Sequence, residues 1–121
     1  MSNTEFQINT DTESTQIRPS VTGLSDGGFV VTWDSYGQDG DGSGIYGQRY
    51  DSSGSTAGLE FQINTHTTGN QHESSVTSLS DGGFVVTWTH EDEVYCQRFD
   101  ADSNMVKYDG EFIAEIMTAL I

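Results

Sequence analysis

An acidic, glycine-rich loop has the residue pattern in this chain that most suggests chemistry. Asp39, Asp41 and Ser43 alternate with glycines over residues 39–44. Oxygen ligands at about positions 1, 3 and 5 followed by Gly open a calcium loop, because a hard cation collects oxygens around a sharp turn. An EF-hand is excluded, since Tyr50 stands where the bidentate Glu is needed. We therefore predict calcium as a cofactor, and the alternative is a flexible acidic hairpin tip.

Arginine and tryptophan recur at equivalent places and form a second candidate site. The chain has only four basic residues, yet two of them lie in repeated aromatic segments. Arg beside Trp and Tyr can hold a sugar through stacking and hydrogen bonds. The candidate ligand-binding residues are Trp33, Arg49, Trp88 and Arg98. The favoured alternative is structural: each Arg forms an ion pair, with Asp26 or Asp81, or stacks on a Trp.

The residues give little support for catalysis. Asp26 and Asp81 could form a carboxylate pair, but each precedes two glycines and is sufficiently explained as a turn residue. No Gly-x-Ser-x-Gly pattern is present, and no His takes the same place in both copies of the repeat described below. Cys96 is the single cysteine, so an internal disulfide is excluded. We predict that the protein is not an enzyme.

These candidate residues belong to one unit that is written twice. Glu5–Thr10 (EFQINT) recurs as Glu60–Thr65, at an offset of 55 residues. At the same offset, 13 of the 15 residues in Pro19–Trp33 are identical. Tyr46–Asp51 then returns as Tyr95–Asp100 at an offset of 49, so the second copy lacks six residues after its Trp. We divide a single domain, 1–121, into repeat 1 (5–59), repeat 2 (60–108) and a tail (109–121).

Each unit is predicted to form four short strands. In the first copy these are Glu5–Thr10, Ser20–Leu24, Gly28–Asp34 and Ile45–Asp51, which alternate in side-chain character. Ser25–Gly28 is predicted as a type I′ hairpin turn. Apolar residues on both faces of the third strand favour a sheet stacked between others, as in a β-propeller blade. Two blades do not close a ring, so we expect self-association or a longer array; the alternative is a β-sandwich.

The repeat resembles a known kind of sequence. Units with SDGGFVVTW, GQDGDGSGIYGQRYDSSG and EFQINT are similar to tandem repeats of very large secreted bacterial proteins, grouped with calcium-dependent adhesins and RTX-type exoproteins. The resemblance covers about residues 5–102 and implies secretion, calcium and a non-enzymatic role. A looser similarity to the Asp-box blades of sialidases stops at Ser25–Asp26, where the intervening residue is missing, so no sialidase chemistry is carried over.

The composition limits the partners. Lys and Arg total 4 against 19 Asp and Glu, which gives a formal net charge of −15. Such a chain favours cations and opposes binding to nucleic acid or an anionic membrane. No apolar run is long enough to insert in a membrane. Met1–Glu5 is not a recognisable signal peptide, although we expect the protein to be extracellular or at the cell surface.

The last residues leave the pattern of the repeat. Apolar side chains over Glu111–Ile121 have helical spacing, which predicts a short C-terminal helix, while the repeat register predicts a strand over Glu111–Ile116. Either form is apolar enough to need cover from its own sheets or from another subunit. The whole sequence thus predicts a non-enzymatic, adhesin-like binding or structural module that forms a homo-oligomer. The alternative is a small oligomeric lectin-like propeller that binds carbohydrate between blades.

Overall fold

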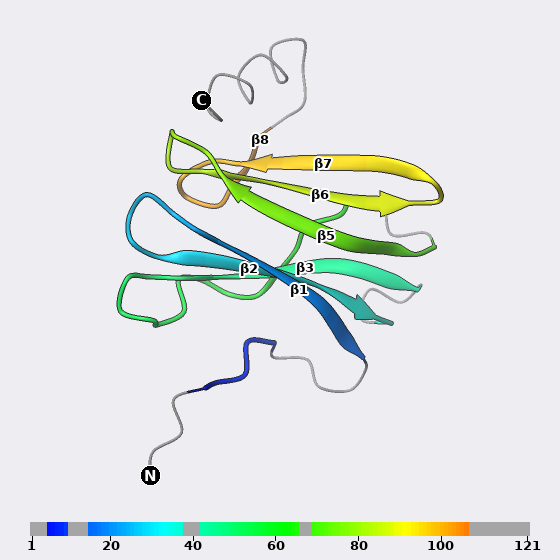
Figure 1. The fold of residues 1–121 in the computed structure, drawn as a ribbon, viewed down its shortest axis with the longest axis horizontal. Helices are drawn as coiled ribbons and strands as arrows, with labels where there is room; N and C mark the ends of the chain where they lie inside the picture. Colours follow the sequence, from blue (N-terminus) through cyan, green and yellow to red (C-terminus); the bar gives the residue numbers. More distant parts are fainter. Residues whose placement is uncertain (1–4, 10–14, 38–41, 66–68, 107–121) are drawn as a thin grey trace.

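Eight strands form two four-stranded antiparallel sheets in the computed structural model, which describes residues 5–9, 15–37, 42–65 and 69–106. The first sheet has the order β1 (Gln16–Gly23), β2 (Phe29–Tyr36), β3 (Ser43–Tyr50), β4 (Phe61–Gln62). The second has the order β5 (Gln71–Ser78), β6 (Phe84–His90), β7 (Glu93–Phe99), β8 (Met105–Val106). Figure 1 shows the two sheets as stacked layers. The predicted all-β class with two four-stranded sheets is confirmed.

The two sheets repeat one another in pairing as well as in sequence. Trp33 lies opposite Tyr46 in the first sheet, and Trp88 lies opposite Tyr95 in the second. Register shifts interrupt β1 and β5 at equivalent places, beside residues with positive φ. Because β-branched and aromatic side chains suit a pleated, half-buried surface, the same residues produce the same register twice.

The hairpin between β1 and β2 differs from the predicted type I′ turn. Gly27 has a φ of 89°, whereas Asp26 keeps an ordinary negative φ, and the N–H of Gly27 donates to Leu24 O at 3.1 Å. The turn is therefore a type I turn followed by a left-handed Gly. The reason lies in the Asp26 carboxylate, which accepts the N–H of Gly28 at 2.8 Å and closes a local ring. Asp81 and Gly83 repeat this bond at 2.9 Å.

The two sheets stack with unlike faces in contact. We call the face with the Phe-Val-Trp side chains of β2 or β6 the front face, and the opposite one the back face. The core between the sheets combines Val30 and Ile45, from the back of the first sheet, with Phe84, Val86 and Trp88, from the front of the second. Strand β5 packs across β1, β2 and β3. Each fully buried side chain of this kind stabilises the fold by roughly 1.5–3 kcal/mol.

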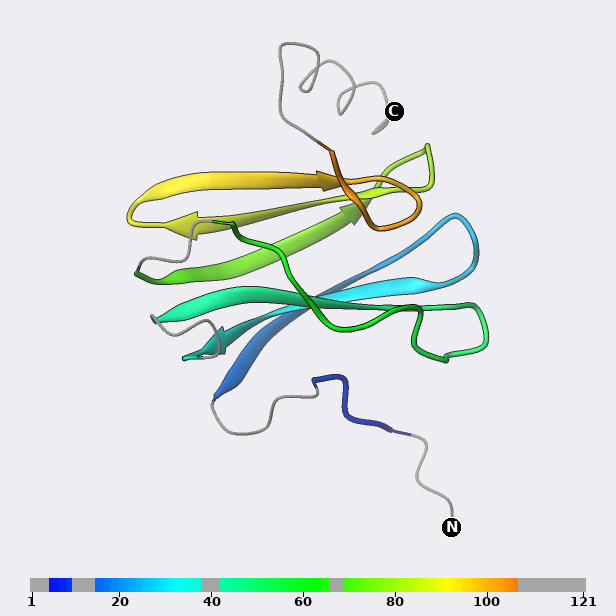
Figure 2. The ribbon, with the colours of Figure 1, turned by 180° about the vertical axis from the view of Figure 1, so that it is seen from behind.

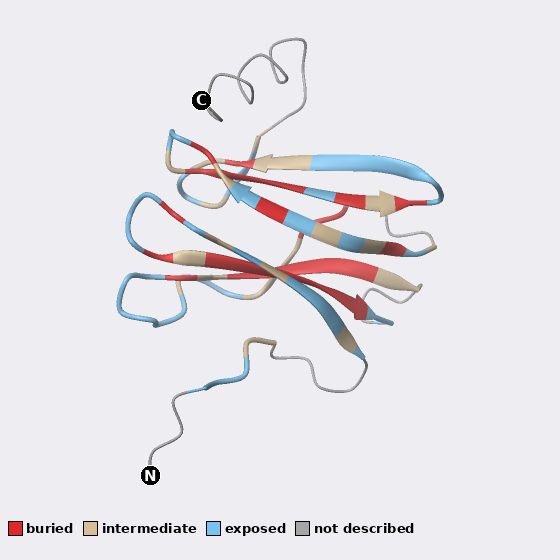
Figure 3. Cartoon of the chain, in the orientation of Figure 1, coloured by how far each residue is buried: buried red, intermediate tan, exposed pale blue. Residues whose placement is uncertain are grey.

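The first sheet is apolar on its front face as well. Val31, Trp33 and Tyr46 form a second buried cluster, against which Ile8 and Phe29 pack. Figure 3 accordingly shows β2 and β3 as almost continuously buried. The predicted need to cover both faces of this strand is confirmed for the first sheet.

The fourth strand of the first sheet comes from the second repeat. Phe61–Gln62 pairs with Tyr46 and Gly47 of β3, and the N–H of Ile63 donates to Ile45 O at 2.7 Å. Figure 2 shows this connection passing from the first sheet toward β5. The prediction that EFQINT begins its own sheet is therefore wrong: the segment at 60–65 joins the sheet before it. Residues 5–9, its first copy, form no strand in the structure.

Gly47 makes this arrangement possible. A Cβ at that position would lie 3.1 Å from both Ile63 Cδ1 and Phe61 Cζ, so the missing side chain lets both residues enter the core. The predicted C-terminal helix or strand lies outside the described residues.

Candidate functional site between the sheets

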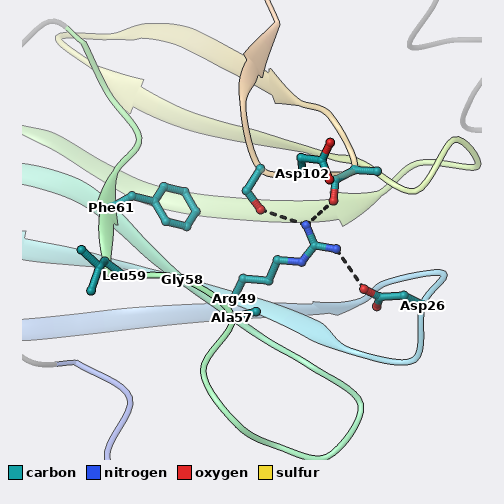
Figure 4. Close-up of a pocket in the computed structure, with 9 residues that line it drawn as sticks. Asp26, Arg49, Ala57, Gly58, Leu59, Phe61 and Asp102 are labelled. Carbon is teal, nitrogen blue, oxygen red and sulfur yellow. Dashed lines mark hydrogen bonds and ion pairs between the residues drawn. The ribbon is translucent and has the colours of Figure 1, made fainter.

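Arg49 lies at the centre of a cleft of about 530 Å³ between the two sheets (Figure 4). The side chain leaves β3 on the back face, since its partner Val30 belongs to the core between the sheets. Asp26 comes from the β1–β2 hairpin, and Asp102 and Ser103 come from the turn after β7. The cleft therefore exists because the two sheets are stacked.

The guanidinium of Arg49 has partners in both sheets. It donates to Asp26 Oδ2 at 3.0 Å, to Ser103 Oγ at 2.9 Å and to the carbonyl oxygen of Ala101. Its side chain is only 12% exposed. These three bonds link the hairpin of the first sheet to a turn of the second.

Arg98 repeats the pairing within the second sheet. Its guanidinium donates to Asp81 Oδ2, and its side chain is as buried as that of Arg49. The ion-pair interpretation of the two arginines is thereby confirmed. An ion pair at equivalent positions in both repeats explains why Arg recurs in a chain with so few basic residues.

The acidic partners are held in their ionised form. The N–H of Gly28 and then the Arg49 side chain lower the pKa of Asp26, and the N–H of Gly83 and Arg98 do the same for the pKa of Asp81. The hydroxyl of Ser53 leads the groups that lower the pKa of Asp51. A general acid near neutral pH needs the opposite shift, so these carboxyls suit a structural role.

The two tryptophans do not line this cleft. Trp33 lies on the front face of the first sheet, opposite to the face of Arg49, and is 3% exposed. Its Nε1 donates to Gln16 Oε1 at 2.9 Å, as Trp88 Nε1 donates to Gln71 Oε1 at 3.2 Å. The structure thus places Trp33 and Arg49 on opposite faces of one sheet, and their ligand-binding role stays a prediction.

Asp34 is a buried acidic residue that the sequence did not single out. It is 1% exposed and accepts hydrogen bonds from Arg18 Nη1 and from the N–H of Glu73, each at 3.1 Å. Because Glu73 belongs to β5, this carboxylate joins the two sheets at the end away from Arg49. The signal was a departure from the repeat, since Thr89 stands at the equivalent position.

The predicted calcium ligands are only partly within the described residues. Asp39 and Asp41 lie outside them, while the N–H of Ser43 donates to Asn70 Oδ1 at 3.0 Å. The described ranges contain no group of three His, Cys, Asp or Glu residues that could hold a metal ion. Within the same ranges, no helix is long and apolar enough to cross a membrane.

Comparison of the chain with protein-family models, curated proteins and solved structures finds no match. The resemblance to secreted tandem repeats therefore rests on the sequence motifs alone. What the structure adds is the direction in which the sheets stack and the polar contacts, around Arg49 and Asp34, that fix it.

Proposed function

We propose that this chain is a non-enzymatic structural module of an extracellular, adhesin-like repeat protein, in which four-stranded sheets stack like propeller blades. One observation carries the proposal. The front face of the second sheet packs on the back face of the first, although the two sheets have nearly the same sequence.

A front-on-back contact is heterologous, so it does not terminate itself. Such contacts generate closed rings or open arrays, depending on the rotation between successive units. Repeat proteins use the same logic, because each unit completes its core against its neighbours. The chain's stacking thus supports a role as a building unit.

The polar contacts between the sheets support a structural role better than a ligand-binding role. Arg49 and Asp34 each link the sheets at one end, and Thr32 Oγ1 lies 3.0 Å from Ser74 Oγ between them. All three contacts involve side chains that are buried or partly buried. The lectin-like alternative has no comparable support, since Trp33 and Arg49 lie on opposite faces of the first sheet.

Extracellular location and stabilisation by calcium belong to the same proposal and rest on the resemblance and on the acidic composition. The net charge of −15 favours a cation. Asp39, Asp41 and Ser43 would supply oxygen ligands of the kind that calcium prefers.

Single-tryptophan variants test the stacked unit. Trp33→Phe leaves Trp88 as a reporter in the second sheet, and Trp88→Phe leaves Trp33 in the first. We expect the fluorescence transition and the far-ultraviolet circular dichroism transition to coincide in each variant, because the shared core makes unfolding cooperative. Separate transitions for the two sheets would overturn the proposal.

A further inference from the structure

The segment Glu5–Asn9 contacts the first sheet as its copy, Glu60–Asn64, contacts the second sheet. The Phe6 ring lies 5.6 Å from the Tyr50 ring at an interplanar angle of 59°. The Phe61 ring lies 5.6 Å from the Phe99 ring at 58°. Each segment therefore contacts the sheet that follows it in the chain.

The copy at 60–64 has a second contact, with the sheet before it. Gln62 lies opposite Tyr46 and Phe61 lies opposite Gly47, while Asn64 Oδ1 accepts the N–H of Ile45 at 2.7 Å. The described part of the chain records no strand pairing for Glu5–Asn9.

The edge of β7 is the counterpart that such a segment would fit. Val94, Tyr95 and Cys96 correspond to Ile45, Tyr46 and Gly47, which pair with β4 or contact the segment around it. In the described part of the chain β8 pairs only with Arg98 and Phe99. Val94 is 78% exposed, whereas Ile45 is fully buried.

The other end of the stack has exposed apolar side chains around its buried front cluster. Val21 on β1 is 63% exposed, whereas the equivalent Val76 is 7% exposed in the core between the sheets. A groove of about 220 Å³ lies between Ile8, Ile17 and Trp33. The front face of the first sheet thus keeps an exposed apolar margin at Val21, although Val31, Trp33 and Tyr46 are already buried.

We propose that a second copy of this chain docks head to tail on the first. Its Glu5–Asn9 segment adds a strand to the edge of β7, with Gln7 opposite Tyr95 and Phe6 opposite Cys96. In this register Arg98 reaches the Ser52 carbonyl of the second copy, as Arg49 reaches that of Ala101. The inference rests on the stacking proposed above and gives it a partner and a register.

Two features weaken this contact relative to the internal one. Cys96 stands where Gly47 admits Phe61 and Ile63, so its side chain crowds the incoming Phe6 and Ile8. Each chain also carries a net charge of −15, and like charges repel at low ionic strength. We therefore expect association to strengthen with salt and to strengthen again in Cys96→Gly.

Cross-linking between two single-cysteine proteins tests the register. In the Cys96→Gly background, one protein carries Gln7→Cys and the other Tyr95→Cys, because directly opposite residues in antiparallel strands approach closely enough for a disulfide. The two are mixed at high salt and oxidised mildly with a glutathione buffer. The matched control replaces Tyr95→Cys by Ser80→Cys, an exposed turn position.

The expected result is a mixed dimer that forms severalfold more in the Gln7–Tyr95 mixture than in the control. Light scattering should show larger species for Cys96→Gly than for the natural chain at the same concentration and salt. A monomer under all these conditions, or a mixed dimer no more abundant than in the control, would overturn the proposal. A disulfide that forms mainly between two Gln7→Cys chains would also overturn it. Coincident transitions in the single-tryptophan variants would then leave internal stacking intact, so the two failures are distinguishable.

Discussion

The two sheets have nearly the same strands and very different surroundings. The first has an apolar cluster on each face, and the edge of β3 receives β4. The second shares a core with the first sheet through its front face, and the described edge of β7 is exposed over Glu93–Cys96. The same valine or isoleucine position is therefore buried in one sheet and open in the other.

This difference teaches that position in the stack, more than local sequence, decides burial. Ile45 and Val94 occupy equivalent places in β3 and β7, yet among the residues that the structure describes only Ile45 has a following segment against it. Repeat 2 also departs from repeat 1 where an inter-sheet contact is made: Cys96 for Gly47 and Thr89 for Asp34. Substitutions at equivalent positions should therefore have unequal effects.

The largest difference in stability is expected between substitutions at Ile45 and at Val94. Ile45→Ala should lower the free energy of unfolding by about 2–5 kcal/mol, because it leaves a cavity in the core between the sheets. Val94→Ala should change it by no more than about 0.5 kcal/mol, as is usual for an exposed position. Denaturant titration of both variants measures the difference, and similar losses would contradict the stacked arrangement.

Asp34 and Thr89 are a second pair of equivalent positions at which substitutions should change stability unequally. Asp34→Asn keeps the shape but loses the charge-assisted bonds to Arg18 and to the N–H of Glu73, so it should cost about 2 kcal/mol. Thr89→Ser, at the equivalent position, should stay within about 0.5 kcal/mol of the natural protein. Thermal or denaturant unfolding tests this; a loss as small as that of Thr89→Ser would remove Asp34 as a link between the sheets.

A smaller effect is the loss of stability at acid pH, which should be similar in both repeats. The pKa values of Asp26 and Asp81 are lowered in the folded chain from an ordinary value of 3.8. Their stabilisation is thus complete above that value and is lost as the pH falls through it toward the lowered folded pKa.

Unfolding at neutral and at acid pH measures this contribution. Asp26→Asn and Asp81→Asn should each be less stable than the natural chain at about pH 7 and should approach its stability near about pH 2–3. A deficit that does not change with pH, or one confined to a single repeat, would break the equivalence of the two ion pairs.

Much of the fold followed from the sequence because the repeat and the alternation of side chains act locally. The strands over 20–24, 28–34 and 45–51 were predicted close to β1, β2 and β3, and a hairpin was predicted at Ser25–Gly28. The membership of EFQINT was missed, since Phe61 and Ile63 obey the same alternation whichever sheet they join. Contacts with residues distant in the chain, the pairing with β3 and the fit against Gly47, assign them to the first sheet.

The candidate site was predictable to a smaller extent. The Arg49–Asp26 and Arg98–Asp81 pairs could be proposed because each recurs in the repeat and the chain holds few other cations. The reach of Arg49 to Ala101 and Ser103 could not, because it depends on how one sheet stacks on the next. Asp34 was missed for the same reason.

The smallest expected effect is stabilisation by calcium, which should depend on a loop of repeat 1 and not on its counterpart in repeat 2. Asp39 and Asp41 belong to a loop that repeat 2 lacks, where Glu91–Glu93 stands instead. If the first loop binds calcium with a Kd of about 1 mM, then about 5 mM calcium stabilises the fold by about 1 kcal/mol, or a few degrees in Tm. The double variant Asp39→Ala/Asp41→Ala should lose this rise, whereas Asp92→Ala/Glu93→Ala should keep it. A rise that survives the first variant and disappears in the second would move the cation to repeat 2, and an unchanged melting curve in the natural chain would remove calcium from its stabilisation.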